Sequence, residues 1–217
     1  MTPDRQDVGA FLARLNRLDA AALVRLRRVA PDRTALWGRL PWAVLVSRTV
    51  AGAGPDDATV AAADLLKAVD LPGDLVLPAR RDAEWRWPLP PAAGRVVEQL
   101  PAAEVRRIAA AAAGTLRAAA TEGVGGRPVA ERAVRDALLD HVAIVVTTDG
   151  AHIEVPQRLV QGVARMGFLG RSDMTPAGTV NVQLAGRWIG LAAPYGIAWL
   201  LPVSQFAVRP ATTRTNG

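Results

Sequence analysis

The sequence VAIVVTTDGAHIEVPQRLVQGVARMGF, residues 142–168, decides the fold class that we expect. Its first residues, 142–147, are apolar and β-branched, and an Asp-Gly dipeptide at 149–150 precedes a second apolar run over His152–Val155. Asp-Gly between two such runs is typical of a tight turn, so this half predicts a β-hairpin. From Pro156 onward apolar residues recur at helical spacing, which predicts a helix.

A second hairpin is predicted further along the chain. Residues Thr179–Leu184 alternate between apolar and polar, Ala185-Gly186 forms a turn signal, and Trp188–Leu201 has room for one or two strands. With a helix predicted over Pro128–Asp140, the chain has the order helix, strand, helix and hairpin, which is the element order of a winged-helix module. In that interpretation Pro156–Phe168 is the presented helix and the hairpin Val180–Trp188 is the wing. Other α+β domains share this order, so the winged helix is one of several interpretations.

The N-terminal two-thirds of the chain are expected to be mainly helical. Apolar residues at three- and four-residue spacing over Val8–Leu18 predict an amphipathic helix. Asp19 is a natural N-cap for a second helix that ends before Pro31, and a short third helix is expected after Asp32. Further helices are expected over Ala58–Val69, Ala92–Leu100 and Ala102–Ala120.

The expected fold class is therefore α+β, with a mainly helical part before a small unit of helices and antiparallel strands. We predict a helical domain over 1–122, with a Pro-rich connector at 71–91 inside it. A winged-helix-like unit follows over 127–209 and a flexible tail over 210–217. The two parts can be separate domains or one body, and both arrangements remain open.

Composition excludes several classes of protein. Of the 217 residues, 50% are hydrophobic and 21% are charged, so the chain is neither disordered nor collagen-like. Because it contains no cysteine, disulfides, thiolate catalysis, Cys-ligated zinc and iron–sulfur clusters are excluded, which fits a reducing cytoplasm. The uncharged stretch Trp188–Val208 is long enough to cross a bilayer, but its glycines and prolines divide it into short pieces typical of strands. We therefore expect a cytoplasmic protein without a membrane partner.

The charge of the chain is unevenly distributed. The formal net charge is +6, and all basic residues except Lys67 are arginine. Residues 1–50 carry +5, residues 51–150 carry −3, and residues 151–217 carry +4. The basic ends can fold together into one basic face, or they can pair with the acidic middle and cancel its field. The first arrangement favours a polyanionic partner such as nucleic acid.

Two groups of residues are candidates for binding nucleic acid. Arg25, Arg27 and Arg28 form the densest basic cluster, with Arg14, Arg17 and Arg33 nearby. Arg158 and Arg165 lie two turns apart on the predicted presented helix with Gln161 between them, and Arg and Gln are the usual side chains that contact base edges. A solvated helix face explains either group equally well.

The segment EWRWPLPP, residues 84–91, is a candidate for binding a protein partner. In an extended chain Trp85 and Trp87 lie on one side, where two aromatic rings could anchor a partner. The alternative is that both rings fill the protein's own core.

Evidence for catalysis in the sequence is weak. His141 and His152 lie near Asp140, Asp149 and Glu154, but no third ligand stands at a metal-site spacing. We identify no catalytic, metal-binding or cofactor-binding residue and expect no cofactor.

Three functions from different classes remain. The first is a non-enzymatic nucleic-acid-associated protein, such as a transcriptional regulator. The second is a protein–protein adaptor or homo-oligomeric scaffold that uses the helical half and the loop of Trp85 and Trp87. The third is an enzyme whose site has no local sequence motif.

Overall fold

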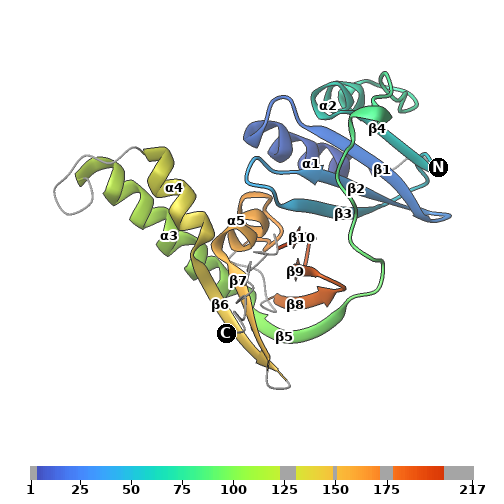
Figure 1. Ribbon diagram of the computed structural model, residues 1–217. Coiled ribbons are helices and arrows are strands. Elements are labelled where there is room, and N and C mark those ends of the chain that lie inside the picture. Colours follow the sequence, from blue (N-terminus) through green and yellow to red (C-terminus); the bar gives the residue numbers. More distant parts are fainter. Residues whose placement is uncertain (1–3, 123–130, 149–150, 172–177, 203–217) are drawn as a thin grey trace, which may run out of the picture.

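An eight-stranded antiparallel sheet forms the centre of the molecule in this computed structural model, which describes residues 4–122, 131–148, 151–171 and 178–202. The strand order is β4-β1-β2-β3-β10-β9-β8-β5 (Figure 1). The strands of this sheet are β1 (Leu23–Ala30), β2 (Arg33–Arg39), β3 (Leu45–Ala51), β4 (Asp57–Ala61), β5 (Arg95–Pro101), β8 (Thr179–Ala185), β9 (Trp188–Ala193) and β10 (Gly196–Leu200). A separate two-stranded sheet pairs β6 (Val142–Thr148) with β7 (Ala151–Pro156).

The two halves of the chain meet inside the large sheet. Strands β3 and β10 pair through Leu45, Val46 and Ser47 on one side and Trp199, Ala198 and Ile197 on the other. The sheet therefore continues from the N-terminal to the C-terminal half, and its two outermost strands are β4 and β5.

Helices cover one face of this sheet. They are α1 (Arg5–Leu18), α2 (Ala62–Asp70), α5 (Gln157–Arg165) and the part of α3 (Ala102–Glu122) near the sheet, while α4 (Glu131–Asp140) packs against α3 and α5. Phe11 of α1 stacks on Phe168, which follows α5, with ring centroids 6.4 Å apart, so these two helices share one core. In α5, a Cβ built on Gly162 would lie 3.2 Å from Val44 and Ala198, so this glycine permits close contact with the sheet. The helices α3 and α4 project away from the sheet as a hairpin (Figure 1).

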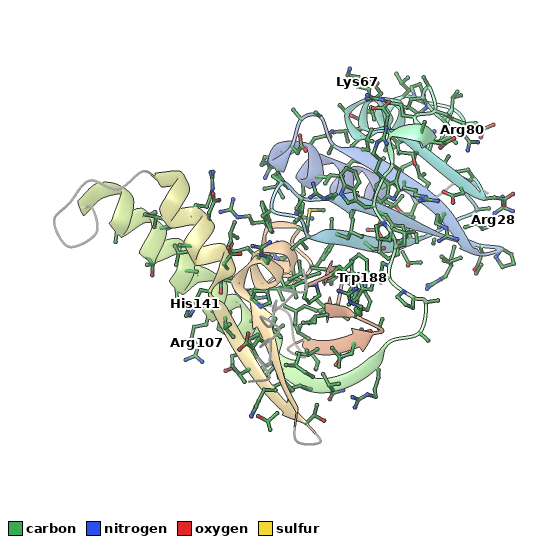
Figure 2. The ribbon with its side chains drawn as sticks, viewed as in Figure 1. Arg28, Lys67, Arg80, Arg107, His141 and Trp188 are labelled. Carbon is green, nitrogen blue, oxygen red and sulfur yellow. The ribbon has the colours of Figure 1, made fainter. Side chains whose placement is uncertain are left out.

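The opposite face of the sheet carries a smaller aromatic core. Leu45, Ala185, Trp188 and Trp199 are buried there, and the connector between β4 and β5 crosses this face and contributes further side chains. We call this group the outer-face cluster. Trp188 lies in the middle of the molecule in Figure 2. Between α2 and β5 the described connector contains one short 3-10 helix, η1 (Asp82–Glu84).

The connector also covers the free edge of β4. The backbone nitrogen of Arg81 donates to the carbonyl oxygen of Thr59 at 2.7 Å, and the Thr59 nitrogen donates to a carboxylate oxygen of Asp82 at 2.7 Å. Edge strands present unpaired backbone groups on which other chains can pair, so these two bonds protect this edge.

The prediction of a mainly helical N-terminal two-thirds is wrong. The expected helix after Asp19 is instead strand β1, and Pro31-Asp32 joins it to β2 where a third helix was expected. Residues Ala58–Ala61 belong to strand β4, and most of Ala92–Leu100 belongs to β5. The cause in β1 is that Val24 and Leu26 alternate with Arg25 and Arg27, and pairing with strands on both sides outweighs the weaker helical spacing.

The winged-helix interpretation is also wrong. Strands β8 and β9 are interior strands of the large sheet rather than a projecting wing. Helix α5 is not presented to solvent, because Leu159, Val160 and Val163 are fully buried against the sheet.

Other predicted elements are confirmed. The structure contains helices α1, α3 and α5, the strand pair β6–β7 and strands β8, β9 and β10 where the sequence predicts them. The Asp149-Gly150 turn, the predicted boundary at 123–126 and the predicted tail at 210–217 lie outside the described residues. The predicted domain division at 122–127 stays a prediction.

Candidate nucleic-acid interface

A cavity of about 480 Å³ opens on the helix-covered side of the sheet. It lies between the end of α1, the turn that joins β2 to β3, and helices α4 and α5. We call it the helix-side pocket, and it is lined by Arg17, Leu18, Pro41, Trp42, Arg135, Asp136, Leu139, Gln161 and Arg165. Three arginines from three helices therefore converge on one indole ring and two leucines.

The arginines of the helix-side pocket differ in their partners. Arg135 lies 4.0 Å from the carboxylate of its neighbour Asp136. Arg17 and Arg165, each in the last turn of its helix, form no ion pair with any residue that the structure describes. A cation at a helix C-terminus is stabilised by the helix dipole, which accounts for their positions. Because a guanidinium is always charged, these two side chains remain available to an anion.

Trp42 forms a fixed wall of the pocket. It lies in a turn in which the Leu40 nitrogen donates to the Val44 carbonyl at 2.8 Å, and Ala43 has the left-handed backbone angle φ 65°. The Trp42 indole nitrogen donates to the backbone carbonyl of Arg158 at 3.1 Å. The guanidinium of Arg165 lies 5.8 Å from the indole centroid, within the range of a cation–π interaction. The ring is therefore held from two sides.

The structure brings two of the three predicted residues of α5, Gln161 and Arg165, to the lining of this pocket, and Arg158 lies beside it. Gln161 is 9% exposed, and its side-chain amide donates to the Ala109 carbonyl at 3.1 Å, so one of its two N–H groups is used within the protein. Arg158 pairs with the carboxylate of Asp140 and donates to the Trp42 carbonyl. Arg165 alone of these three projects its charge to the pocket without an acidic partner among the described residues.

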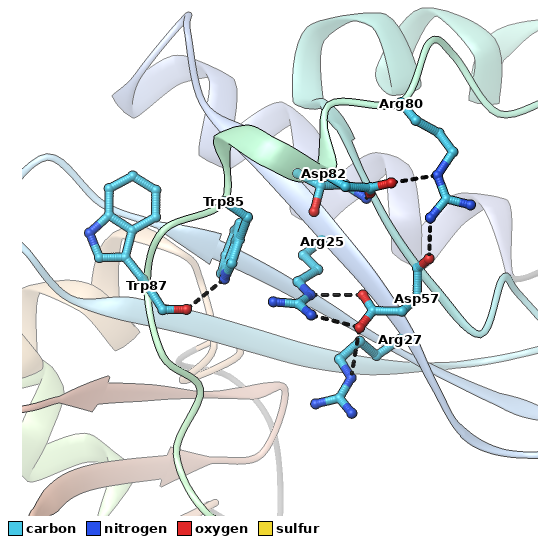
Figure 3. A network of polar contacts seen from close by, with 8 residues as sticks. Arg25, Arg27, Asp57, Arg80, Asp82, Trp85 and Trp87 are labelled. Atoms are coloured by element: carbon cyan, nitrogen blue, oxygen red, sulfur yellow. Dashed lines mark hydrogen bonds and ion pairs between the residues drawn. The ribbon is translucent and has the colours of Figure 1, made fainter.

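Arg25, Arg27 and Arg28 lie elsewhere, on strand β1, and acidic residues neutralise them. Arg25 forms a two-point ion pair with Asp57 of β4, with distances of 2.7 and 2.6 Å, and Arg27 approaches the same carboxylate at 3.6 Å (Figure 3). Arg28 pairs with Asp56 at 3.1 Å. The hydrogen bond from Arg25 lowers the pKa of Asp57 below its usual value, so the carboxylate stays charged. Here the basic N-terminal segment pairs with the acidic middle of the chain.

Trp85 and Trp87 lie on the outer face, and the connector holds them there. Both rings are half-buried against the outer-face cluster, and the Trp85 indole nitrogen donates to the Trp87 carbonyl at 2.7 Å (Figure 3). Trp85 lies over Arg25 at 5.9 Å and Trp87 over Arg39 at 4.6 Å. Burial lowers the pKa of Arg39 from its usual value. That these rings bind a protein partner stays a prediction.

Two negative findings concern the described residues. They contain no group of three or more side chains suited to hold a metal ion, and the exposed His152 ring is hydrogen-bonded to Thr147 at 3.1 Å. Among the same residues, no helix is both long and apolar enough to cross a membrane.

Trp42, Arg135 and Asp136 of the helix-side pocket were not among the predicted site residues, and Arg17 was named only as a neighbour of other arginines. The dipeptide Pro41-Trp42 between two apolar runs was a usable sign of a turn that presents an aromatic ring. Nothing local indicates that Arg135 joins them, because α4 reaches the pocket only through its packing against α3 and α5.

Comparison with known families gives two matches. A model described as "Domain of unknown function (DUF8185)" matches residues 89–205, and one described as "Domain of unknown function (DUF8010)" matches residues 2–87. The two matches meet inside the Pro-rich connector. No curated protein matches the chain.

Solved structures of bacterial sliding clamps have a similar fold. The DNA polymerase III subunit beta from Pseudomonas aeruginosa matches 93% of this chain with a TM-score of 0.56 and 16% identity. The beta subunit from the DNA polymerase of Streptococcus pyogenes matches 92% with a TM-score of 0.56 and 12% identity. The sliding clamp of Bartonella birtlesii matches 93% with a TM-score of 0.56 and 14% identity.

This likeness shows the fold alone, because the identities are low. The matches cover 64% of each of these clamps, so the chain spans about two-thirds of their length or slightly less. The large antiparallel sheet with helices on one face is thus a sliding-clamp type of architecture.

Proposed function

We propose that this chain, which belongs to the family described as domain of unknown function DUF8185, is a non-enzymatic protein that binds nucleic acid on the helix-covered side of its sheet. The observation that carries the proposal is the pair Arg17 and Arg165, two permanent charges that line one pocket and have no ion pair among the described residues. Guanidinium groups bind phosphate oxygens through two parallel hydrogen bonds.

The distribution of charge supports this side rather than the opposite one. On the outer face, Asp57 already neutralises Arg25 and Arg27, and at the end of β1 Asp56 pairs with Arg28. A phosphate would have to compete with these carboxylates there, whereas at the helix-side pocket it meets unpaired cations. Of the residues of α5 predicted to bind nucleic acid, we therefore propose Arg165 as the ligand of phosphate. Arg158 and Gln161 support the wall of the pocket.

The clamp-type fold adds a second line of support. The similar solved proteins are DNA polymerase subunits, as their descriptions state. We extend from them only the class of ligand, nucleic acid, and expect a cytoplasmic protein that needs no cofactor.

The test compares two double charge reversals of equal size. Arg17→Glu with Arg165→Glu changes the pocket, and Lys67→Glu with Arg107→Glu changes two exposed cations that do not line it and lie far apart in Figure 2. Fluorescence anisotropy with labelled mixed-sequence DNA at low salt measures the affinity. We expect the pocket variant to bind on the order of tenfold or more weakly and the control to stay within about twofold. Equal losses in both variants would show that only net charge matters.

A second candidate function is self-association or binding of a protein partner. It is favoured by β5, the edge strand at the far end of the sheet, whose residues are mostly exposed, including Val96 at 45%. Exposed edges pair with other chains unless charge or cover prevents it. Native mass spectrometry of Val96→Lys tests this. A fall in assembly mass supports pairing through β5, and an unchanged mass contradicts this second candidate function.

A further inference from the structure

The helix-side pocket has more space and more apolar surface than a phosphate group needs. Its volume is about 480 Å³, within the range of roughly 300–1,000 Å³ that small-molecule sites occupy. Trp42, Leu18 and Leu139 form an apolar wall, and the arginines stand at its rim. A phosphate ion alone would contact the arginines and leave the apolar wall exposed to solvent.

The charge of the pocket matches a nucleotide better than a simple anion. Besides Arg17, Arg135 and Arg165 it contains one carboxylate, that of Asp136. A carboxylate repels a phosphate, but it accepts hydrogen bonds from the amino or imino groups of a base. Cations, an indole and one acceptor in a single cavity are the groups that a nucleoside phosphate requires.

Trp42 is suited to stack on a base, because its position is fixed before a ligand arrives. Its indole nitrogen is bound to the Arg158 carbonyl, and its backbone lies in the turn with Ala43 in the left-handed conformation. When a base stacks on a ring that is already fixed, binding costs the conformational entropy of the base but not that of the ring. Stacking on an aromatic side chain is available only to a base that has left its own stack.

We propose that the helix-side pocket binds one unstacked nucleotide, with its base against Trp42 and its phosphate between Arg17 and Arg165. This inference rests on the proposed function and narrows it, since it predicts a preference for single-stranded over fully paired nucleic acid. A nucleotide within a strand and a free nucleotide share this chemistry, and the experiment below separates them.

The experiment measures binding of the full chain to three labelled probes: a short oligothymidine, an abasic oligonucleotide of the same length, and a blunt duplex. The abasic strand keeps every phosphate and removes the bases. We expect the wild type to bind oligothymidine on the order of tenfold more tightly than the abasic strand. Equal affinity for these two probes would overturn the inference and leave the proposed phosphate contacts intact.

The variants Trp42→Ala and Trp42→Phe give the second measurement. We expect Trp42→Ala to lose the preference for oligothymidine over the abasic strand and to keep its affinity for the duplex, and Trp42→Phe to retain most of the preference. Trp85→Ala is the matched control, because it removes another half-buried indole on the outer face. A preference that survives in Trp42→Ala overturns the inference.

Competition with free thymidine monophosphate identifies the source of the nucleotide. Displacement of oligothymidine at micromolar concentration assigns the pocket to free nucleotides, whereas no displacement at millimolar concentration assigns it to a strand. If the wild type binds none of the three probes even at low salt, both the inference and the proposed function are wrong.

Discussion

Arg25 of β1 reaches diagonally to Asp57 of β4, which lies opposite Arg27 in the strand register, and the two side chains are joined by two hydrogen bonds of 2.7 and 2.6 Å. The same carboxylate lies 3.6 Å from Arg27, so one aspartate partners two of the three arginines in the densest basic cluster of the sequence. This pairing neutralises two arginines of that cluster within the protein itself.

The ion pair predicts how stability depends on pH. The pKa of Asp57 in the folded protein is lowered, first by the hydrogen bond from Arg25, so the carboxylate favours the folded state at every pH above its unfolded pKa of about 3.9. That contribution is lost as the pH falls through the lower folded-state value. The difference in unfolding free energy between wild type and Asp57→Asn should therefore be constant from about pH 5 to 8 and shrink below about pH 4.

Urea unfolding of the wild type and Asp57→Asn at several pH values checks this pH dependence. Arg25→Gln and the variant that carries both substitutions complete a double-mutant cycle. The side chain of Asp57 is 40% exposed, so solvent screening keeps the effect small. If the difference in unfolding free energy between the wild type and Asp57→Asn stayed constant down to pH 2, the lowered pKa of Asp57 would be contradicted.

Substitution of glycine by alanine should change the stability of the fold in opposite directions at Gly190 and Gly114. A Cβ on Gly190 of β9 would lie 2.6 Å from the ring of Trp199, whereas one on Gly114 of α3 would meet nothing within 4 Å. Gly190→Ala should therefore destabilise the fold by about 1–3 kcal/mol through overpacking. Gly114→Ala should stabilise it by about 0.5–1 kcal/mol through helix propensity. Thermal unfolding of both variants tests the close packing of the outer-face cluster, and two shifts of the same sign would contradict it.

Substitution of Trp87 tests whether its ring attaches the connector to the sheet. Trp87→Ala removes a half-buried ring from the outer-face cluster and from its contact with Arg39. The loss of stability should be smaller than the about 3–5 kcal/mol typical of a fully buried aromatic residue. Limited proteolysis should cut the connector faster than in the wild type, because its attachment to the sheet is weaker.

An unchanged cleavage rate together with a lower assembly mass would instead assign Trp87 to a protein partner. Native mass spectrometry of Trp85→Ala with Trp87→Ala measures this second outcome directly.

The C-terminal part of the fold was predictable because its signals are local. The alternation over 179–184 and the helical spacing after Pro156 each specify an element within a few residues. The N-terminal part was not, because β1 satisfies two patterns: Leu23, Leu26 and Ala30 recur at helical spacing, while Val24 and Leu26 alternate with arginines. Pairing with β2 and with the more distant β4 decides between them, and the contact with β4 cannot be read from the local pattern.

The candidate site was predictable in its residue types but not in its assembly. Arg165 and Gln161 stood out in the sequence, yet Gln161 is turned inward to the Ala109 carbonyl. Arg17 and Trp42 reach the same pocket from distant segments. The sequence has basic ends and an acidic middle, and the structure pairs Arg25 with the middle segment and places Arg17 and Arg165, from the two ends, in the lining of one pocket.

The central claim is that the arginines of the helix-side pocket contact phosphates, and salt dependence tests it most directly. For duplex DNA, the slope of the logarithm of the binding constant against the logarithm of salt concentration reports how many phosphates the protein neutralises. We predict that Arg17→Ala and Arg165→Ala each reduce this slope by about 1, while Arg107→Ala leaves it unchanged. Parallel lines for the wild type and both pocket variants would contradict the account.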